Sequence, residues 1–339
     1  MIAFTVLRRI GGSIPSLIGV IVVTFLLSRA LPGDPAVYFA GPAANAESVQ
    51  QVRESLGLDK SWPEQFVRYI VDLAHGSLGN SLTTGQPVMS DLIQRLPASI
   101  ELTLAALIFA IVVAVPLGVL AAARPDSAID HLCRGLVTVG AAFPTFFIAL
   151  LFVYVFYYLL GWAPQPLGRL DEIYYSMPQQ VTGLLTVDTL IAGDLDAFRG
   201  ALAQLILPSI ALGLFALAPI ARMTRASMLA ALGSDFVRTA RANGLSRRTI
   251  LFTYAFRNAL LGIVNTMGMV FSFLLGSNVL IEQVFGWPGI GSYAVSAVIA
   301  SDYAAVQGFI LMMAIAYVLL NLGVDLVAGL IDPRVRYEG

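Results

Sequence analysis

The chain has 339 residues, 58% of them hydrophobic and only 12% charged, and its mean hydropathy is +0.80. A soluble domain carries about 25% charged residues, so this composition excludes an ordinary soluble globular protein. The formal net charge of −1 says little about partners, because positive and negative residues are segregated along the chain.

Six apolar stretches without charged residues follow one another: 10–28, 102–123, 135–160, 200–221, 258–281 and 303–324. Each is about as long as the roughly 20 residues that a helix needs to cross a ~30 Å hydrocarbon core. Because backbone polar groups in lipid must be satisfied internally, we expect every stretch to be helical. A seventh stretch, 283–301, begins with Gly286, Pro288 and two further glycines, and we expect a surface or re-entrant segment. The sequence therefore predicts an all-α polytopic membrane protein with six transmembrane helices.

The distribution of arginine predicts the orientation of these helices. If Arg8 and Arg9 are cytoplasmic, six spans place the arginines near the other inner span ends on the same side, where the positive-inside bias is strongest. These residues are Arg124, Arg134, Arg222, Arg225, Arg238, Arg241, Arg247, Arg248, Arg257, Arg334 and Arg336. Most acidic residues fall in the segments that are left outside, 32–97, 161–199 and 283–302. Both termini are therefore expected in the cytoplasm, and the only cysteine, Cys133, is expected on that reducing side.

Three parts of the chain are distinguished. Residues 1–97 hold the first helix and a long external segment, residues 98–331 hold five helices, and residues 332–339 form a short cytoplasmic tail. Because Leu31-Pro32-Gly33-Asp34-Pro35 follows the first apolar stretch, we expect a helix stop and not a cleaved signal peptide.

The external segment contains two short amphipathic patterns, at 46–56 and 62–74. The second places Trp62, Phe66, Tyr69 and Ile70 on one face, which suits either the membrane interface or packing against the spans. Within the spans, Pro116 and Pro208 each have a glycine nearby, and such residues allow kinks and close helix approach. These glycines are Gly118 and Gly213.

The sequence lacks the residues of several enzyme classes. The only lysine is Lys60, so no phosphate-binding G-x-x-x-x-G-K-[ST] loop exists. The two histidines, His75 and His131, are expected on opposite faces of the membrane and cannot share a metal ion. A membrane enzyme is therefore disfavoured, and we expect this chain to bind neither a cofactor nor a metal ion.

Few ionisable residues are expected within the bilayer. Asp325 is the one serious candidate for coupling transport to an ion, but we favour a role in capping or pairing at the inner end of the sixth span. Glu101, Glu282 and Arg29 lie at span boundaries, where we expect their side chains to extend towards water.

The cytoplasmic loop 222–257 carries the most information about function. Ser234 or Asp235 is expected to cap a short helix over 236–243, with Gly244 in the left-handed conformation after it and Ser246 capping the next helix. Arg238 and Arg241 are three residues apart and share a face. A small basic helix of this kind suits docking into a groove of a soluble partner or contact with anionic lipid headgroups. A DNA-binding helix-turn-helix is disfavoured because the loop is tethered between two spans, so no nucleic-acid partner is expected.

The segment from Arg238 to Gly244 resembles the coupling-loop signature of ATP-binding-cassette (ABC) importer permeases, a Glu-Ala-Ala triplet followed after three residues by glycine. Ala240 matches the last alanine and Gly244 the glycine. Arg238 and Thr239 depart from the first two letters, and Arg257 stands where many members have proline. These departures resemble the branch that imports dipeptides, oligopeptides and nickel.

Further stretches extend the resemblance, to B-type subunits of dipeptide permeases, over nearly the whole chain. They are Leu31-Pro32-Gly33-Asp34-Pro35, Leu56-Gly57-Leu58-Asp59-Lys60, Gly76-Ser77-Leu78-Gly79-Asn80-Ser81, Ala221-Arg222-Met223-Thr224-Arg225, Phe285-Gly286-Trp287-Pro288-Gly289-Ile290-Gly291, Asp302-Tyr303, Val306-Gln307-Gly308, Asn321, Asp325 and Asp332-Pro333-Arg334.

The resemblance implies a type-I ABC importer permease fold in a bacterial inner membrane, with the five-helix core at 98–331. It implies partners: a homologous second permease, two cytoplasmic ATPase subunits that hold ATP and magnesium, and a periplasmic or extracellular substrate-binding protein. The binding protein is expected at 161–199 and 283–302. The expected coupling residues are Asp235 as helix cap, Arg238 and Arg241 as docking contacts, Gly244 as the turn, and Ala240 and Arg248.

The expected substrate is a dipeptide or short oligopeptide. The same scaffold could import nickel, glutathione or antimicrobial peptides, because the binding protein largely determines substrate choice. Two interpretations from other classes are an ion-coupled secondary transporter, which would work alone, and a structural membrane anchor, which would transport nothing.

Overall fold

The computed structural model describes residues 2–30, 34–41 and 43–331, and these residues form helices joined by loops. The tail 332–339, residues 31–33 of the expected helix stop, and the side chains of Arg8 and Arg9 lie outside the described residues. The chain divides into two compact units. One consists of Met1–Pro97 and Pro288–Val318, and the other of Ala98–Trp287 and Leu319–Gly339.

Among the described residues, four helices are long and apolar enough to cross a membrane. They are α5 (Val88–Ala123), α9 (Leu195–Leu232), α14 (Tyr303–Ile331) and a continuous helix over Arg247–Phe285, which consists of α11 (Arg247–Thr249), the π-helix η2 (Ile250–Ala255) and α12 (Phe256–Phe285). The helices expected at 102–123, 200–221, 258–281 and 303–324 are confirmed. The first apolar stretch lies within α1 (Ile2–Ala30).

The stretch 135–160 is not a single helix, and this expectation was wrong. Helix α6 (Ala128–Ala142) stops at Phe143, whose φ of −112° and ψ of 140° are extended. Helix α7 (Thr145–Phe152) begins after Pro144 and continues into the π-helix η1 (Val153–Leu159). Proline lacks an amide hydrogen and disfavours the helical conformation of the residue before it. Pro144 therefore accounts for the break at Phe143.

Close approach between helices holds the second unit together. A Cβ atom on Gly213 of α9 would lie 2.7 Å from the carbonyl oxygen of Ala106 on α5, and one on Gly118 of α5 would lie 2.7 Å from Cβ of Thr224. Buried alanines surround these contacts on both helices, among them Ala106, Ala110, Ala114, Ala211, Ala216 and Ala221. Small residues let helix backbones approach in a bilayer, where packing replaces the hydrophobic effect. Gly118 and Gly213 therefore allow the close approach of α5 and α9, a task that the sequence did not assign to any particular glycine.

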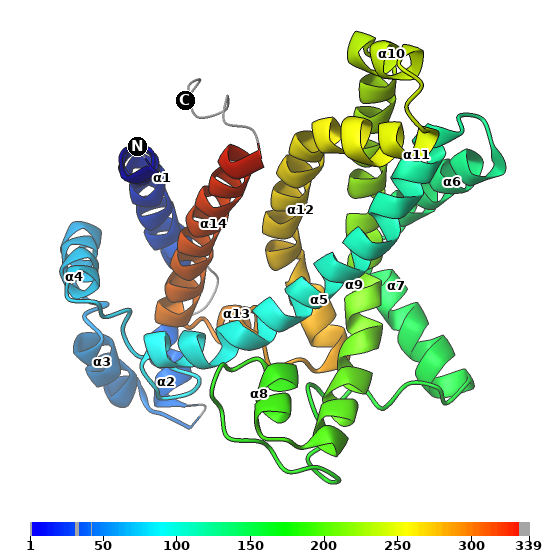
Figure 1. Cartoon of the computed structure of the whole chain (residues 1–339). Helices are drawn as coiled ribbons and strands as arrows, with labels where there is room; N and C mark the ends of the chain where they lie inside the picture. Colours follow the sequence, from blue (N-terminus) through cyan, green and yellow to red (C-terminus); the bar gives the residue numbers. More distant parts are fainter. Residues whose placement is uncertain (1, 31–33, 42, 332–339) are drawn as a thin grey trace. The chain divides into compact units, whose positions relative to one another are not determined.

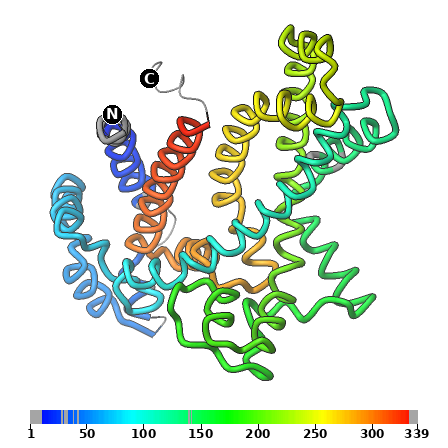
Figure 2. The backbone as a smooth tube through the Cα atoms, in the orientation of Figure 1, coloured from blue at the N-terminus to red at the C-terminus, as the bar shows by residue number. Residues whose placement is uncertain are grey.

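The two ends of α9 carry different structures (Figure 1). At its N-terminal end lie α8 (Leu185–Ile191) and the irregular segment that precedes it. At its C-terminal end the chain forms the short helix α10 (Asp235–Ala242), turns, and returns through α11 into α12, as the tube in Figure 2 shows. The start of α6 lies at this same end (Figure 1).

In the first unit, the segment between α1 and α5 folds into short helices. They are α2 (Pro35–Ala40), α3 (Ala46–Ser55) and α4 (Trp62–Ala74), and the last two confirm the expected amphipathic helices. Phe66 of α4 packs edge-on against Phe25 of α1, with ring centroids 5.0 Å apart, and Tyr69 stacks on the same ring. Trp62 and Ile70 are exposed. The amphipathic face of α4 is therefore shared between packing on α1 and an open surface.

Helix α13 (Ile290–Ile299) has ten residues, about 15 Å of helix, which is too short to cross a bilayer. Ile290, Tyr293 and Ala297 are buried in the core of the first unit, whereas Val298 and Ile299 are exposed, so the segment packs on this unit through one face. Asp302 then caps α14. One of its oxygens accepts from the amide of Ala305 (3.1 Å), and the other accepts from the Ser81 hydroxyl and the Leu82 amide, both at 2.7 Å. This buried carboxylate fastens the loop around Ser81 to the start of α14.

Gly213→Ala tests the close approach of α5 and α9. The added methyl group must push apart backbone that cannot yield cheaply, and overpacking of this kind costs about 1–3 kcal/mol. We expect the variant to lower the melting temperature of the purified protein by several degrees. Gly276→Ala in α12 is the matched control, because a Cβ there meets no described atom within 4 Å. Equal melting temperatures for the two variants would contradict the packing interpretation.

Candidate functional site

The start of α10 is defined by Ser234, which lies in the cap position with φ −77° and ψ 159°. Its hydroxyl donates to the carbonyl oxygen of Ala231 at 2.5 Å and accepts no bond from the helix. Asp235 is the first residue of the helix, so the expectation that it acts as the cap is wrong. Its carboxylate still favours this end, where helix amides leave a partial positive charge, and lies 3.4 Å from Nη1 of Arg238.

The turn after α10 depends on Gly244. Its φ is +75°, which confirms the left-handed conformation expected from the sequence. The amide of Gly244 donates to the oxygen of Arg241 (3.0 Å), and the amide of Leu245 donates to that of Ala240 (3.2 Å), which closes the end of the helix. A Cβ on Gly244 would meet no described atom within 4 Å. The restriction at this position therefore comes from the backbone alone.

Helix α10 has a buried face and a basic face. Val237 and Ala240 are buried against Ile250 of η2, with Leu232 of α9 packed beside them. Ala240 is 5% exposed, so it positions the helix and is not available to a partner. The side chain of Arg238 is 83% exposed, and Arg241 and Arg248 are exposed as well. The arrangement places the guanidinium groups of Arg238 and Arg241 outward on a helix that is anchored by its apolar side, and Arg248 is exposed on α11.

The chain after Gly244 is fixed at two points. The hydroxyl of Ser246 accepts from the amide of Thr249 at 3.2 Å, which confirms Ser246 as the cap of the helix that leads into α12. Arg247 donates through Nη2 to the carbonyl oxygen of Ala123 at 2.6 Å. Because Ala123 is the last residue of α5, this bond satisfies a carbonyl that the helix leaves unpaired.

A buried ion pair lies close to this loop, and sequence reasoning did not find it. Asp130, in the first turn of α6, is fully buried. Arg225 of α9 donates to its two oxygens from Nε (2.5 Å) and Nη2 (2.9 Å), and Arg134 donates from Nη2 (2.7 Å). The hydrogen bonds from Arg225, then those from Arg134, hold the pKa of this carboxyl well below its usual range. Arg225 was recognised only as part of a basic segment, because nothing local connects it to Asp130.

Two further carboxylates correct the expectation for residues at span boundaries. Glu101 of α5 is buried, and it accepts bonds from Arg169 Nη2 (2.5 Å) and from the amide and hydroxyl of Thr186 (both 2.7 Å). Glu282 of α12 is also buried, and the hydroxyl of Ser99 donates to it at 2.5 Å. Both side chains are held inside the second unit by partners and do not extend towards water.

Arg29, in the first unit, differs from these two residues. It is partly buried, its guanidinium lies 3.9 Å from the ring centroid of Phe25, and it donates to Gln65. Its side chain therefore packs on Phe25 and is held by Gln65 of α4.

Known protein families match nearly the whole chain. Residues 114–337 match the family described as the binding-protein-dependent transport system inner membrane component, and residues 1–103 match its N-terminal family. The chain belongs to this family. It is thus the membrane component of a binding-protein-dependent transporter, located in the inner membrane, and the family resemblance of the sequence is confirmed.

Curated relatives are similar over their whole length. A probable D,D-dipeptide transport system permease protein, DdpB, of Escherichia coli K12 is 41% identical over 340 residues, covering 100% of this chain and 99% of the relative. The di/tripeptide transport system permease protein DppB of Pseudomonas aeruginosa is 40% identical, with 100% of both chains covered. The dipeptide transport system permease protein DppB of E. coli K12 is 39% identical, with 98% of both covered.

A solved structure shows the fold. Inward-facing conformations of the MetNI methionine ABC transporter match with a TM-score of 0.53 and 18% identity, covering 72% of this chain and 97% of that chain. This permease therefore has the ABC transporter permease fold. The loop around α10 and the buried ion pairs described above all lie in the second unit of this chain.

Asp130→Asn tests the ion pair beside the loop. Removing this carboxylate leaves Arg225 without its counter-charge and leaves Arg134 with the exposed Asp126 alone, so we expect the melting temperature of the purified permease to fall by on the order of 10 °C at neutral pH. Asp126→Asn is the control, because Asp126 also accepts from Arg134 but its side chain is 81% exposed, and surface pairs contribute little. Equal losses for both variants would count against a special role for Asp130.

The same pair predicts a pH dependence. The pKa of Asp130 is lower in the folded than in the unfolded chain, so its ionised form stabilises the fold above the unfolded value of about 3.9. That stabilisation is lost as the pH falls from there through the folded value. The difference in melting temperature between wild type and Asp130→Asn should therefore be constant near neutrality and shrink below about pH 4.

Proposed function

We propose that this chain is the permease subunit of an ATP-driven importer of dipeptides or short oligopeptides. The observation that carries the proposal is the full-length similarity, near 40% identity, to permeases named for di- and tripeptide transport. The anchored basic helix α10 supports ATP hydrolysis by a partner as the energy source. A transporter driven by an ion gradient needs no rigid docking element for a soluble partner.

The chain crosses the membrane six times in this proposal. The spans are α1, α5, the broken segment over residues 135–159, α9, the helix ending in α12, and α14. Both termini lie in the cytoplasm, because this orientation places Arg238, Arg241 and Arg248 on the inner side. A kinked third span is compatible with lipid if neighbouring helices cover the backbone groups freed at Pro144.

Helix α10 docks into an ATPase subunit through Asp235, Arg238 and Arg241, together with Arg248 of α11. Ala240 and Gly244 fix the orientation of the helix. A homologous permease binds a second ATPase, and ATP-driven closure of the two ATPases moves both docking helices. The movement passes from α10 to α9 and α12 through the contacts of Val237 and Ala240, and to α5 through the bond between Arg247 and Ala123.

A substrate-binding protein delivers the peptide from outside, at the segments 161–199 and 283–302. In the first of these segments Ile173, Tyr174, Met177 and Val181 expose large apolar side chains. Exposed apolar groups in a polar loop are typical of a surface that another protein covers. The same loop is fastened to α5 through Arg169, Thr186 and Glu101.

Uptake of labelled dipeptides in a strain deleted for this gene tests the function. Restoring the wild-type chain should restore uptake, and depleting ATP while a proton gradient is maintained should abolish it. Uptake that follows the proton gradient and ignores ATP would overturn the proposal in favour of an ion-coupled transporter. Uptake unchanged by the deletion would exclude peptide import by this chain.

Gly244→Val tests the docking loop in the same strain. A β-branched side chain at φ +75° is strained by roughly 1–2 kcal/mol, and its bulk projects from the loop surface where a partner must fit. We expect inserted, abundant protein with severely reduced peptide uptake and loss of the ATPase subunits on mild detergent extraction.

Two control variants make that result specific. Gly193→Val introduces the same strain at φ +72°, also in open space, but in the external turn before α9, so ATPase attachment should persist. Gly244→Asn should retain most activity, because asparagine tolerates the left-handed conformation. Normal uptake by Gly244→Val with the ATPase attached would show that this loop does not transmit the motion.

Labelling of introduced cysteines tests the orientation. The native Cys133 is buried, so its protection from reagents would not be informative, and Cys133→Ser provides the background. Gln179→Cys and Asn243→Cys both occupy exposed positions. In intact cells an impermeant thiol reagent should label Gln179→Cys readily and Asn243→Cys only after permeabilisation. The reverse pattern would invert the topology.

A further inference from the structure

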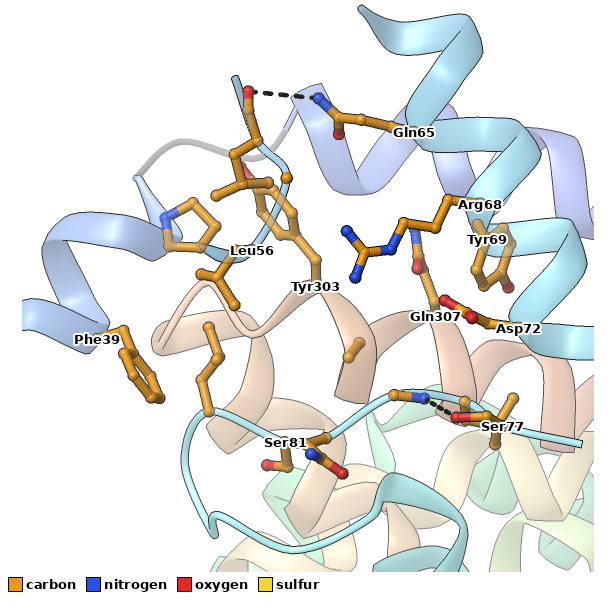
Figure 3. Close-up of a pocket in the computed structure, with 18 of the residues that line it drawn as sticks. Phe39, Leu56, Gln65, Arg68, Tyr69, Asp72, Ser77, Ser81, Tyr303 and Gln307 are labelled. Atoms are coloured by element: carbon orange, nitrogen blue, oxygen red, sulfur yellow. Dashed lines mark hydrogen bonds between the residues drawn. The ribbon is translucent and has the colours of Figure 1, made fainter. Parts of the chain in front are cut away.

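The first unit contains a pocket of about 470 Å³ that the coupling mechanism does not use (Figure 3). This volume lies in the range of small-molecule sites. Apolar side chains from α2 and from the loops after α3 and before α5 line one part of it, namely Phe39, Leu56, Leu58 and Leu82. Polar and charged groups gather in another part, around Arg68, Tyr69, Asp72 and Gln307. The pocket therefore offers an apolar region next to a charged one.

The guanidinium group of Arg68 points into the middle of this pocket (Figure 3). It lies directly over Gly57, since a Cβ on that glycine would be 2.9 Å from Arg68 Nη1. In the part of the chain that the structure describes, Arg68 forms no ion pair, whereas Arg53 in the same unit is paired with Asp34. Arg68 is exposed, and a guanidinium group that lacks a counter-charge forms charge-assisted hydrogen bonds with a carboxylate that enters the pocket.

Asp72 supplies the opposite charge one helical turn further along α4, beside Gln307 (Figure 3). It too lacks an ion-pair partner among the described residues, although residues four apart on a helix commonly pair. Between the two in sequence, the hydroxyl of Tyr69 is buried and has no hydrogen-bond partner within the described chain. A buried hydroxyl left unpaired is costly, and a polar ligand atom would satisfy it.

The spacing of the two charges limits the ligand. Four residues of helix rise about 6 Å, and two residues of extended peptide span about 7 Å between their ends. A free dipeptide carries an ammonium group and a carboxylate at this separation, and the apolar region can accept one of its side chains. The terminal charges are shared by all free peptides, so a site that reads them accepts many sequences.

We propose that this pocket binds zwitterionic di- and tripeptides through their ends, with Arg68 on the carboxylate and Asp72 on the ammonium group. The inference rests on the proposed function and adds a substrate site on the permease itself.

Equilibrium dialysis with radiolabelled Ala-Phe tests the pocket directly. The assembled transporter, without its binding protein, is placed in nanodiscs of phosphatidylglycerol and phosphatidylcholine. We expect saturable binding that unlabelled Ala-Phe displaces and that neither Ala-Phe amide nor N-acetyl-Ala-Phe displaces at tenfold higher concentration. The proposal would be overturned if the amide and the acetylated peptide displaced the label as effectively as Ala-Phe does. It would also be overturned if no saturable binding were found.

Variants assign the two ends. Arg68→Gln should weaken binding of Ala-Phe at least tenfold, and this variant should no longer prefer Ala-Phe to its amide. Asp72→Asn should also weaken binding of Ala-Phe at least tenfold, and it should no longer prefer Ala-Phe to N-acetyl-Ala-Phe. Lys60→Gln and Glu47→Gln change the same charges in the same unit outside the pocket lining and should bind normally. Arg68→Lys keeps the charge and should recover part of the affinity, which separates recognition from folding. Unaltered binding in Arg68→Gln would refute the site.

Two more measurements are needed. One distinguishes a peptide site from a lipid site, and the other separates failure of the pocket proposal from failure of the proposed transport function. The headgroup of phosphatidylethanolamine is also zwitterionic, so adding this lipid to the nanodiscs should leave peptide binding unchanged, and its loss would assign the pocket to lipid. Peptide uptake in the deletion strain measures the proposed function independently. Normal uptake together with absent binding by the transporter would refute the pocket and leave the importer standing.

Discussion

The carboxylate of Asp130 is a charge removed from water, and such a group is stable only when partners surround it. Arg134 holds it within α6, and Arg225 holds it to α9 through two hydrogen bonds. The remaining turns of α9 after Arg225 lead directly to Ser234 and α10. The direction of α10 therefore depends on the position at which Asp130 and Arg225 join α6 to α9.

Three long helices meet behind α10. Helix α9 contributes Leu232, the segment leading into α12 contributes Ile250, and α5 contributes the carbonyl of Ala123 that accepts from Arg247. Since close-packed interiors deform little, a displacement of α10 cannot be absorbed locally and must move these helices. At the other end of α5, Glu101 binds Arg169 and Thr186. The same helix thus contacts the segment after α10 through Ala123 and the segment that includes α8 through Glu101.

Local signals in the sequence were sufficient for part of this structure. The left-handed Gly244, the cap at Ser246 and the amphipathic helices α3 and α4 depend on residues within a few positions of one another, and each was predicted. The cap at the start of α10 was assigned one residue too late in the candidate site, because Ser234 and Asp235 are both good caps and only geometry distinguishes them. The break at Phe143 was missed because hydropathy does not register the effect of Pro144 on the backbone.

Contacts between distant residues could not be predicted in this way. Asp130 and Arg225 are 95 residues apart in sequence, and Glu101 meets Arg169 only because a loop folds back on α5. A carboxylate near a span end is compatible with water exposure until its partner is known, so Glu101 and Glu282 were misjudged. The pocket beside Arg68 also depends on the loop around Ser81 and the start of α14, which are remote from α4 in sequence.

The π-helix η2 joins the docking loop to α12. A π turn closes its hydrogen bonds one residue later than an α turn, so it behaves as an α-helix that has gained a residue. Each residue of an α-helix accounts for about 100° of rotation. The number of residues in η2, from 250 to 255, therefore determines the direction in which α10 faces relative to α12. Removing one of residues 251–255 would keep Ile250 and the exposed arginines in the chain, yet rotate α10 by about 100° relative to α12.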